Sequence, residues 1–239
     1  MRAIGSNIVT ARYIGDKHVI GRYIGKQQVF GDYIHQGLIH HFDGHNNTGN
    51  GTFDPDADVW IDLVTGIQAI LQNVSWQNYG VSFTSTASKV FYSGQNVQQY
   101  TIFNTHMITD FIGLHPRVFG ENPYPTLYLN SNLNYPYSLF AQGKDAPFIP
   151  SIIPTQGSVM QAAIRFSGSE TVDLFYNGIL TANITDVVSY PSPVSTMYIG
   201  CREADDRTFT GKIYEHLVYN RALTDDEVYH NYLVSTQRY

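Results

Sequence analysis

The sequence predicts an all-β chain: an antiparallel β-sandwich with one short C-terminal helix, preceded by a short β-repeat stem. Three observations support this fold class. Short β-branched and aromatic runs separated by turn residues fill most of the chain, a ten-residue echo opens it, and one helix signal lies near its end. With 239 residues, the chain is long enough to bury a substantial core.

The opening echo consists of Tyr-Ile-Gly triplets and single valines that recur every ten residues. Glycines separate the apolar pairs, which indicates short strands and tight turns. Such repeats cannot bury their apolar faces alone. We therefore expect residues 1–36 to form a stem that joins copies of the chain, with a trimer favoured, or attaches it to a particle; docking on the main sheet is the alternative. The residues expected to make these contacts are Tyr13, Ile14, Val19, Tyr23, Ile24, Val29, Tyr33 and Ile34.

From Gly37 onward, short apolar runs alternate with turn signals, as is typical of a β-sandwich. The Asn177-Gly178 pair predicts a tight hairpin, since both residues tolerate positive φ. Seven prolines from Pro116 to Pro154 indicate a loop-rich stretch between two halves of the sandwich. The strands predicted most clearly are Gly80–Thr84, Gln99–Phe103, Thr126–Leu129, Met160–Phe166, Val172–Tyr176, Ile179–Ala182, Met197–Gly200 and Gly211–Tyr219.

The helix signal is a capping box, in which the Thr224 hydroxyl and the Glu227 carboxylate satisfy each other's free backbone N–H groups. Val228 and Tyr232 supply a short apolar face behind it. This predicts a single short helix near the C-terminus.

Charge is divided unevenly. Residues 1–35 have a net charge of +3 and the remainder a net charge of −9. A basic arm could dock on an acidic body, although so small an excess also arises by chance. No dense Lys/Arg stripe and no run of membrane-spanning length occur, so we expect neither a nucleic-acid nor a membrane partner.

Two stretches resemble a known family. The first contains Phe42-Asp-Gly, then Asn46-Asn-Thr-Gly-Asn-Gly and Trp60-Ile-Asp-Leu-Val-Thr-Gly; the second runs from Phe209 through Tyr219-Asn-Arg-Ala-Leu-Thr. Over roughly residues 37–235 they resemble the laminin-G type of the concanavalin A-like lectin/glucanase superfamily. The resemblance implies a jelly-roll domain over 37–239. The usual serine of the family is displaced at Val64-Thr65, which leaves the expected fold unchanged.

The same opening motif behind Tyr-Ile-Gly repeats resembles phage and prophage virion proteins. This implies a structural protein of the virion surface, as a head fibre, decoration or tail component. Its partners would be other virion proteins and host surface glycans. The alternatives are an adhesion module of a cellular surface protein and a glycan hydrolase. A single cysteine and no signal-like run at Met1–Gly5 favour synthesis in a host cytoplasm.

We expect no enzymatic activity. Glucanases of this superfamily place carboxylates in a Glu-x-Asp-x-x-Glu arrangement on one strand, and none of the five glutamates here has that spacing. Glu170 and Asp173 are three residues apart, so their side chains would point to opposite faces of a strand. Cys201 lacks an apparent histidine partner and is expected to be buried and inert.

Two groups could hold a metal, although no cofactor is required. Asp54, Asp56 and Asp58 alternate in one segment, which suits a hard cation such as Ca²⁺; a solvated acidic loop is the alternative. The histidines at positions 40, 41 and 45 could also ligate a metal, but a polar strand end is favoured.

Sugar binding needs exposed rings flanked by amides or carboxylates, since rings stack on pyranose faces while amides bind hydroxyls. Three segments have this composition, with simple packing as the alternative for each. Their candidate residues are Trp76, Asn78, Tyr79, Tyr124, Tyr135 and Tyr137. Trp60, inside the family-like motif, is expected to lie in the core.

Overall fold

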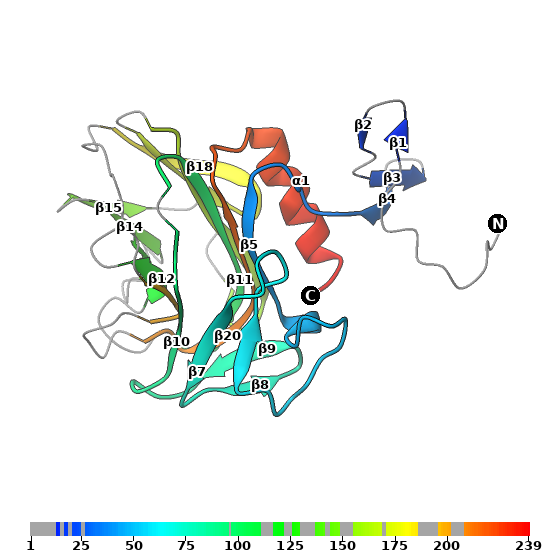
Figure 1. The fold of residues 1–239 in the computed structure, drawn as a ribbon. Helices are drawn as coiled ribbons and strands as arrows, with labels where there is room; N and C mark the ends of the chain where they lie inside the picture. Colours follow the sequence, from blue (N-terminus) through cyan, green and yellow to red (C-terminus); the bar gives the residue numbers. More distant parts are fainter. Residues whose placement is uncertain are drawn as a thin grey trace, which may run out of the picture.

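The computed structural model describes residues 32–95, 97–110, 155–168, 171–185, 196–201 and 208–239. Elsewhere it describes the strands, mostly as backbone alone. The fold is a β-sandwich in which two antiparallel sheets face each other, with the one α-helix of the described residues on one outer side (Figure 1).

Sheet I has the strand order β15-β14-β13-β12-β19-β10-β7-β6. Its strands are β6 (Val59–Ile61), β7 (Gln68–Gln72), β10 (Lys89–Tyr92), β12 (Arg117–Glu121), β13 (Thr126–Leu129), β14 (Tyr137–Ala141), β15 (Lys144–Phe148) and β19 (Met197–Ile199).

Sheet II has the order β18-β17-β16-β11-β20-β9-β8, with β5 also paired to β20. Its strands are β5 (Leu38–Asp43), β8 (Ser75–Gln77), β9 (Gly80–Phe83), β11 (Tyr100–Ile108), β16 (Val159–Phe166), β17 (Val172–Tyr176), β18 (Ile179–Ile184) and β20 (Gly211–Tyr219).

Every strand predicted above is present within a few residues, and the hairpin is confirmed. Asn177 and Gly178 have φ of +48° and +76° and join β17 to β18. The proline-rich stretch contains the predicted strand as β13 and, beyond the prediction, contributes β12, β14 and β15 to sheet I. Pro147 lies in β15, which pairs only with β14 among the described strands, so its missing N–H interrupts no central ladder.

Aromatic side chains fill the space between the sheets. Trp60 is fully buried, as predicted; its ring meets Phe42 and Trp76 edge to face, and its Nε1 donates to the Asp43 carbonyl at 3.1 Å. Such contacts add specificity to the large apolar area that the rings bury.

A second cluster lies on the outer side of sheet II, under α1 (Asp225–Thr236). Alternate β20 residues such as Leu217 and Tyr219 face outward and pack with Val228 and Val234 of the helix. The predicted capping box of Thr224 and Glu227 is present. The helix therefore covers an apolar stripe that would otherwise face water.

The repeat segment forms the short strands that its glycine spacing predicts. Strand β1 (Tyr13–Ile14) pairs with β2 (Lys17–His18), and β3 (Gly21–Ile24) with β4 (Gln27–Gly31). Among the described strands, none of these four pairs with the sandwich. Val19, a predicted contact, lies wholly outside the described residues. The side chains of the other predicted contacts in this segment also lie outside them, namely Tyr13, Ile14, Tyr23, Ile24 and Val29.

Tyr33 and Ile34 do not present the free face expected of them. Both are buried; the Tyr33 hydroxyl lies 3.3 Å from Ser235 Oγ, and Ile34 N–H donates to Asn231 at 3.1 Å. The reason is that the apolar cluster under α1 offers them a surface within the same chain. The packed body thus includes Tyr33 and Ile34.

Candidate functional site

Tyr79 projects from the turn between β8 and β9, and it is 43% exposed. Its ring stacks on the ring of His45, with the centroids 4.0 Å apart, and meets the edge of Phe53 at 4.9 Å. His45 is itself fixed, because its Nε2 donates to the Arg238 carbonyl at 2.9 Å. The structure therefore holds one aromatic ring rigidly at the surface.

The backbone at this turn is unusual. Asn78 and Tyr79 have φ of +50° and +64°, a region that costs free energy for a tyrosine. The turn also packs tightly on Gly44, where an added Cβ would lie 1.7 Å from the Tyr79 carbonyl oxygen. Strain of this kind persists only where the surroundings impose it, and here it holds the Tyr79 ring on His45.

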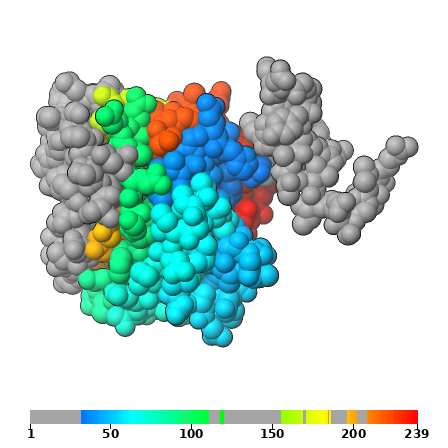
Figure 2. Space-filling model, in the orientation of Figure 1, coloured from blue at the N-terminus to red at the C-terminus, as the bar shows by residue number. Residues whose placement is uncertain are grey.

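Polar residues adjoin Tyr79 in the sequence and lie in the loop that its ring contacts. Gln77 and Asn78 are exposed beside it. The loop that carries His45 and Phe53 contains an exposed hydrogen-bonded set in which Asn50 Oδ1 accepts from the hydroxyls of Thr48 and Thr52. In the space-filling view this part of the chain (blue to cyan) forms one continuous surface (Figure 2). A ring flanked by amides and hydroxyls suits a polyhydroxylated ligand.

The other predicted sugar contacts have different outcomes. Trp76 is wrong as a contact, because it is buried between Phe53 and Trp60 and its Nε1 donates to the Ala57 carbonyl. Tyr124, Tyr135 and the side chain of Tyr137 lie outside the described residues. Asn78 and Tyr79 are brought together at the surface.

A second aromatic surface was missed by the sequence analysis. On the outer face of sheet I, the cross-strand register aligns Ile70, Phe91 and Tyr198 in one row. The rings of Phe91 and Tyr198 are 5.7 Å apart. Ile70 is exposed, Phe91 is half-buried and Tyr198 is buried, so Ile70 and Phe91 form the accessible part of the row. More than 100 residues separate Phe91 from Tyr198, so only the strand pairing could have revealed this row.

The acidic loop does not form the predicted cation site. Asp54, Asp56 and Asp58 are all exposed, and Asp54 Oδ1 accepts the Asp56 N–H at 2.9 Å. Among the described residues, no group of three His, Cys, Asp or Glu side chains is placed to hold a metal. The histidines at positions 40, 41 and 45 form no metal site either, because their rings bond to different groups. These partners are Asp62, Glu215 and the Arg238 carbonyl, respectively. Local turn hydrogen bonds, rather than convergence on an ion, explain the spacing of the aspartates.

His40 and Asp62 form a buried pair, with Nδ1 2.8 Å from Oδ2. Burial alone would raise the pKa of Asp62, but hydrogen bonds from His40, Thr65 and the N–H groups of His41 and Val64 outweigh it and lower that pKa. His40 also lines a small, mostly apolar pocket between the sheets. Because Asp62 accepts from the turn that follows it, the pair closes that turn in the family-like motif.

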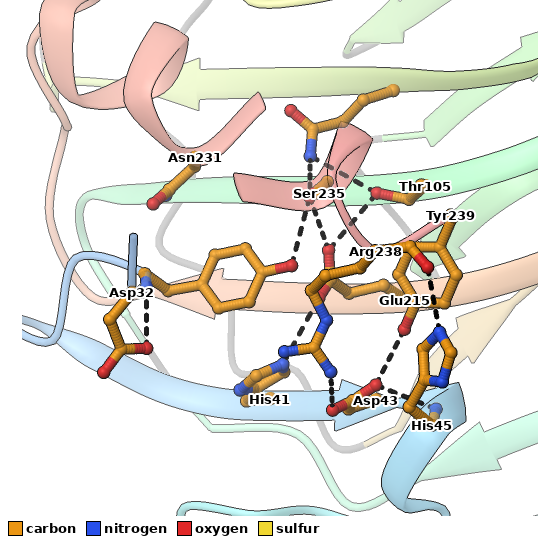
Figure 3. Close-up of polar contacts among 12 residues, drawn as sticks. Asp32, His41, Asp43, His45, Thr105, Glu215, Asn231, Ser235, Arg238 and Tyr239 are labelled. Carbon is orange, nitrogen blue, oxygen red and sulfur yellow. Dashed lines mark hydrogen bonds and ion pairs between the residues drawn. The ribbon is translucent and has the colours of Figure 1, made fainter. Parts of the chain in front are cut away.

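Glu215 is the other fully buried carboxylate of the described residues, and it lies under α1 (Figure 3). It accepts hydrogen bonds from Ser235 at 2.7 Å and Thr105 at 3.3 Å, and His41 Nε2 lies 3.4 Å away. Gln161 donates to Ser235, to which the Tyr33 hydroxyl is also bonded. These groups form hydrogen bonds with one another, so the site is a structural link between α1 and sheet II.

The same network includes the chain end. Asp43 pairs with Arg238 and accepts from the Tyr239 hydroxyl at 2.7 Å. Burial would raise the pKa of Asp43. The charges of Arg238 and His41, with hydrogen bonds from the Tyr239 hydroxyl and the His45 N–H, hold that pKa below its ordinary value. We call the set Tyr33, His41, Asp43, Thr105, Gln161, Glu215, Ser235, Arg238 and Tyr239 the outer network.

Cys201 is buried, as expected, and burial raises the pKa of its thiol to about 12. Asp173, a member of the weak carboxylate pair discussed above, is bound by Arg165 at 2.7 Å. None of the described helices is long and apolar enough to cross a membrane.

These features agree with the comparisons. Residues 111–229 match the model of the concanavalin A-like lectin/glucanases superfamily, laminin-G type. The chain therefore carries a lectin/glucanase-like β-sandwich domain, as the sequence motifs implied. No curated protein is significantly similar to it in sequence.

Solved structures share the fold at low sequence identity. A Trypanosoma rangeli sialidase in complex with the inhibitor DANA aligns with a TM-score of 0.69 and 14% identity, over 90% of this chain and 35% of the sialidase. Domain 4 of AbnA, an extracellular arabinanase from Geobacillus stearothermophilus, in complex with arabinotriose, gives 0.63 and 15%, over 80% of this chain and 96% of that domain. The chain thus spans about a third of the sialidase and corresponds to nearly the whole arabinanase domain.

Proposed function

We propose that this chain is a non-catalytic glycan-binding protein of a virion surface, with Tyr79 as its main sugar contact. The observation that carries the proposal is the exposed, immobilised Tyr79 ring. A ring already stacked on His45 loses little conformational entropy when a pyranose stacks on it.

The flanking groups supply the polar half of such a site. The amides of Gln77 and Asn78 can donate to and accept from sugar hydroxyls, while the ring covers the C–H face. That a domain of the same fold was solved with arabinotriose supports a sugar ligand. One ring and two amides predict weak binding per site, so useful attachment needs many copies.

The virion role rests on the repeat segment. Paired strands β1–β4, with a net positive charge and Tyr-Ile-Gly spacing, suit a segment that joins copies or attaches them to a particle. The resemblance to phage and prophage proteins points the same way. Portal, capsid or tail genes beside the gene for this chain would support this part of the proposal, and a neighbourhood of cell-wall enzymes would oppose it.

A glycan array with the protein displayed multivalently would identify a ligand, and titration with that monovalent sugar would then measure single-site affinity. We expect Tyr79→Ala to weaken it at least tenfold, whereas Tyr229→Ala, which removes a similarly exposed tyrosine, leaves it unchanged. If Tyr79→Ala binds normally and Phe91→Ala does not, the site is the row on sheet I.

The non-catalytic assignment has its own test. The buried carboxylates Asp62 and Glu215 are engaged in hydrogen bonds within the fold, which supports a structural role for them. We expect no release of reducing sugar from the identified glycan. Release that disappears when a single carboxylate is replaced would show that the protein is a hydrolase.

A further inference from the structure

The ring of His45 contacts two tyrosine rings. It stacks on Tyr79, with the centroids 4.0 Å apart and the planes inclined by 26°, and the Tyr239 ring lies 5.0 Å away at 32°. Tyr239 in turn meets the ring of Tyr214 on β20, at 5.2 Å. These four side chains come from separate segments and form one connected series, in which Tyr79 is the most exposed and Tyr214 is buried.

Hydrogen bonds fix His45 within this series (Figure 3). Its Nε2 donates to the Arg238 carbonyl at 2.9 Å, and its backbone N–H donates to Asp43 Oδ1 at 2.9 Å. The same carboxylate oxygen accepts from the Tyr239 hydroxyl at 2.7 Å. One carboxylate therefore holds both His45 and Tyr239, and that carboxylate is itself paired with Arg238.

The backbone beside His45 also contacts the Tyr79 turn. Gly44 lies between Asp43 and His45 in the sequence, and an added Cβ there would lie 1.7 Å from the Tyr79 carbonyl oxygen and 2.8 Å from that of Tyr214. The positive φ of Tyr79, +64°, persists only where the surroundings impose it. The segment from Asp43 to His45 supplies such surroundings for both the backbone and the ring of Tyr79.

We propose that His45 and Tyr239 are positioning residues of the sugar site: His45 sets the orientation of the Tyr79 ring, and Tyr239 sets the orientation of His45. The inference rests on the proposed role of Tyr79 as the sugar contact. A ring that is already oriented loses less conformational freedom when a sugar stacks on it. The effect of both residues on sugar affinity therefore passes through Tyr79.

The first test needs no sugar. Tetranitromethane nitrates accessible tyrosine rings, and Tyr229 (47% exposed, against 43% for Tyr79) is the internal reference. We expect His45→Ala to raise the nitration of Tyr79 relative to Tyr229 about threefold, measured by peptide mass spectrometry, because the ring loses its stacking partner. His45→Phe restores a ring and should return the ratio close to the wild-type value. His35→Ala, which removes an exposed histidine elsewhere, is the control.

The second member of the pair has a graded expectation in the same experiment. Tyr239→Ala should raise the nitration ratio about twofold, because His45 keeps its hydrogen bonds but loses one ring contact. Tyr239→Phe keeps the ring and should raise the ratio less. A ratio that stays unchanged in both His45→Ala and Tyr239→Ala would overturn the inference.

The second test is a double-mutant cycle with the monovalent sugar that the glycan array selects, presented on a multivalent surface so that weakened variants remain measurable. We expect His45→Ala to weaken the apparent Kd about fivefold in the wild-type background and to have little further effect in the Tyr79→Ala background. Equal weakening in both backgrounds would mean that His45 acts through the fold as a whole and would overturn the inference.

The outcomes separate the two proposals. Normal sugar binding by Tyr79→Ala would overturn the proposed sugar site. Loss of binding in Tyr79→Ala together with normal binding in His45→Ala would overturn the inference alone. If the array selects no sugar, the proposed function fails, and the nitration ratio decides whether His45 and Tyr239 hold the Tyr79 ring.

Discussion

The two faces of sheet II bury polar groups in opposite ways. The inner face, against sheet I, holds His106 and His216 fully buried and neutral among aromatic rings. The outer face, under α1, holds Glu215 and the Asp43–Arg238 ion pair within a dense set of hydrogen bonds. Adjacent residues of β20, Glu215 and His216, belong to different faces.

The two faces of sheet II are therefore stabilised by different interactions. Between the sheets, strands far apart in sequence supply a continuous apolar volume, so His106 and His216 stay uncharged there. Under α1, residues from both ends of the chain meet over a sheet that is only partly apolar, and charged groups are tolerated because each finds partners. Substitutions on the two faces should therefore differ in size and in pH dependence.

The largest effect should come from the inner face. Trp60→Ala removes a fully buried ring that contacts Phe42 and Trp76, and we expect a loss of about 4 kcal/mol in the free energy of unfolding. Urea unfolding followed by tryptophan fluorescence of Trp76 measures it. A loss below about 1 kcal/mol would mean that the ring does not contribute to a packed core.

The outer face should yield a smaller, charge-specific effect. Arg238→Met keeps much of the side-chain volume but leaves Asp43 without its cation, and we expect a loss of about 2 kcal/mol. Arg238→Lys should recover part of it in the same urea experiment. Equal stability of the methionine and wild-type chains would show that the ion pair contributes nothing.

The inner face should make stability depend on pH. Burial lowers the pKa of His216 to about 3 and that of His106 to about 4, so both stay neutral in the folded state. Below pH 6.5 the unfolded chain binds protons that the folded chain does not. Stability should then fall by about 1.4 kcal/mol per pH unit for each histidine, down to its folded pKa.

Urea unfolding between pH 6.5 and 4.5 measures this slope. In His216→Gln the slope should be smaller by about 1.4 kcal/mol per pH unit, whatever the absolute stability of the variant. Asp43 and Asp62, whose pKa values are lowered, stabilise the fold above their ordinary pKa and lose that contribution only as pH falls below about 4. An unchanged slope in the variant would contradict the neutral, buried state of His216.

The smallest effect is expected at the helix start. Thr224→Ala removes the hydroxyl that accepts the Glu227 N–H, at a cost of about 1 kcal/mol. Thr236→Ala, at the other end of α1, is the control, because its hydroxyl caps no N–H group. If both substitutions cost the same, the capping box does not stabilise the helix.

Local patterns predicted the fold well. Asn177-Gly178 and the Thr224–Glu227 box were predictable because a few neighbouring residues determine a tight turn or a helix cap. Within the proline-rich stretch, the strand Thr126–Leu129 was predictable from its apolar residues, whereas β15 was not, since proline count alone does not distinguish a loop from an edge strand. Tyr79 could be predicted as a sugar contact from the amide residues beside it in the sequence, but its stacking partner His45 could not be predicted.

Long-range packing explains what the sequence could not predict. Trp76 and Tyr79 are three residues apart, and both have polar neighbours in the sequence. Trp76 is nevertheless buried, because Phe53 and Trp60 cover its ring, whereas Tyr79 is exposed. Likewise, Tyr33 follows the repeat pattern, but its ring belongs to the cluster under α1. Neither outcome can be deduced without the register of strands distant in sequence.

The position of His45 has a mechanical consequence. Its ring supports Tyr79, its Nε2 is bonded to the Arg238 carbonyl, and the Arg238 guanidinium lies 5.7 Å from the centre of the Tyr33 ring. These contacts form a chain of side chains between the exposed Tyr79 and Tyr33, which follows the repeat segment directly in sequence. A change at the Tyr79 turn is therefore expected to be felt at Tyr33, without passing through the aromatic interior between the sheets.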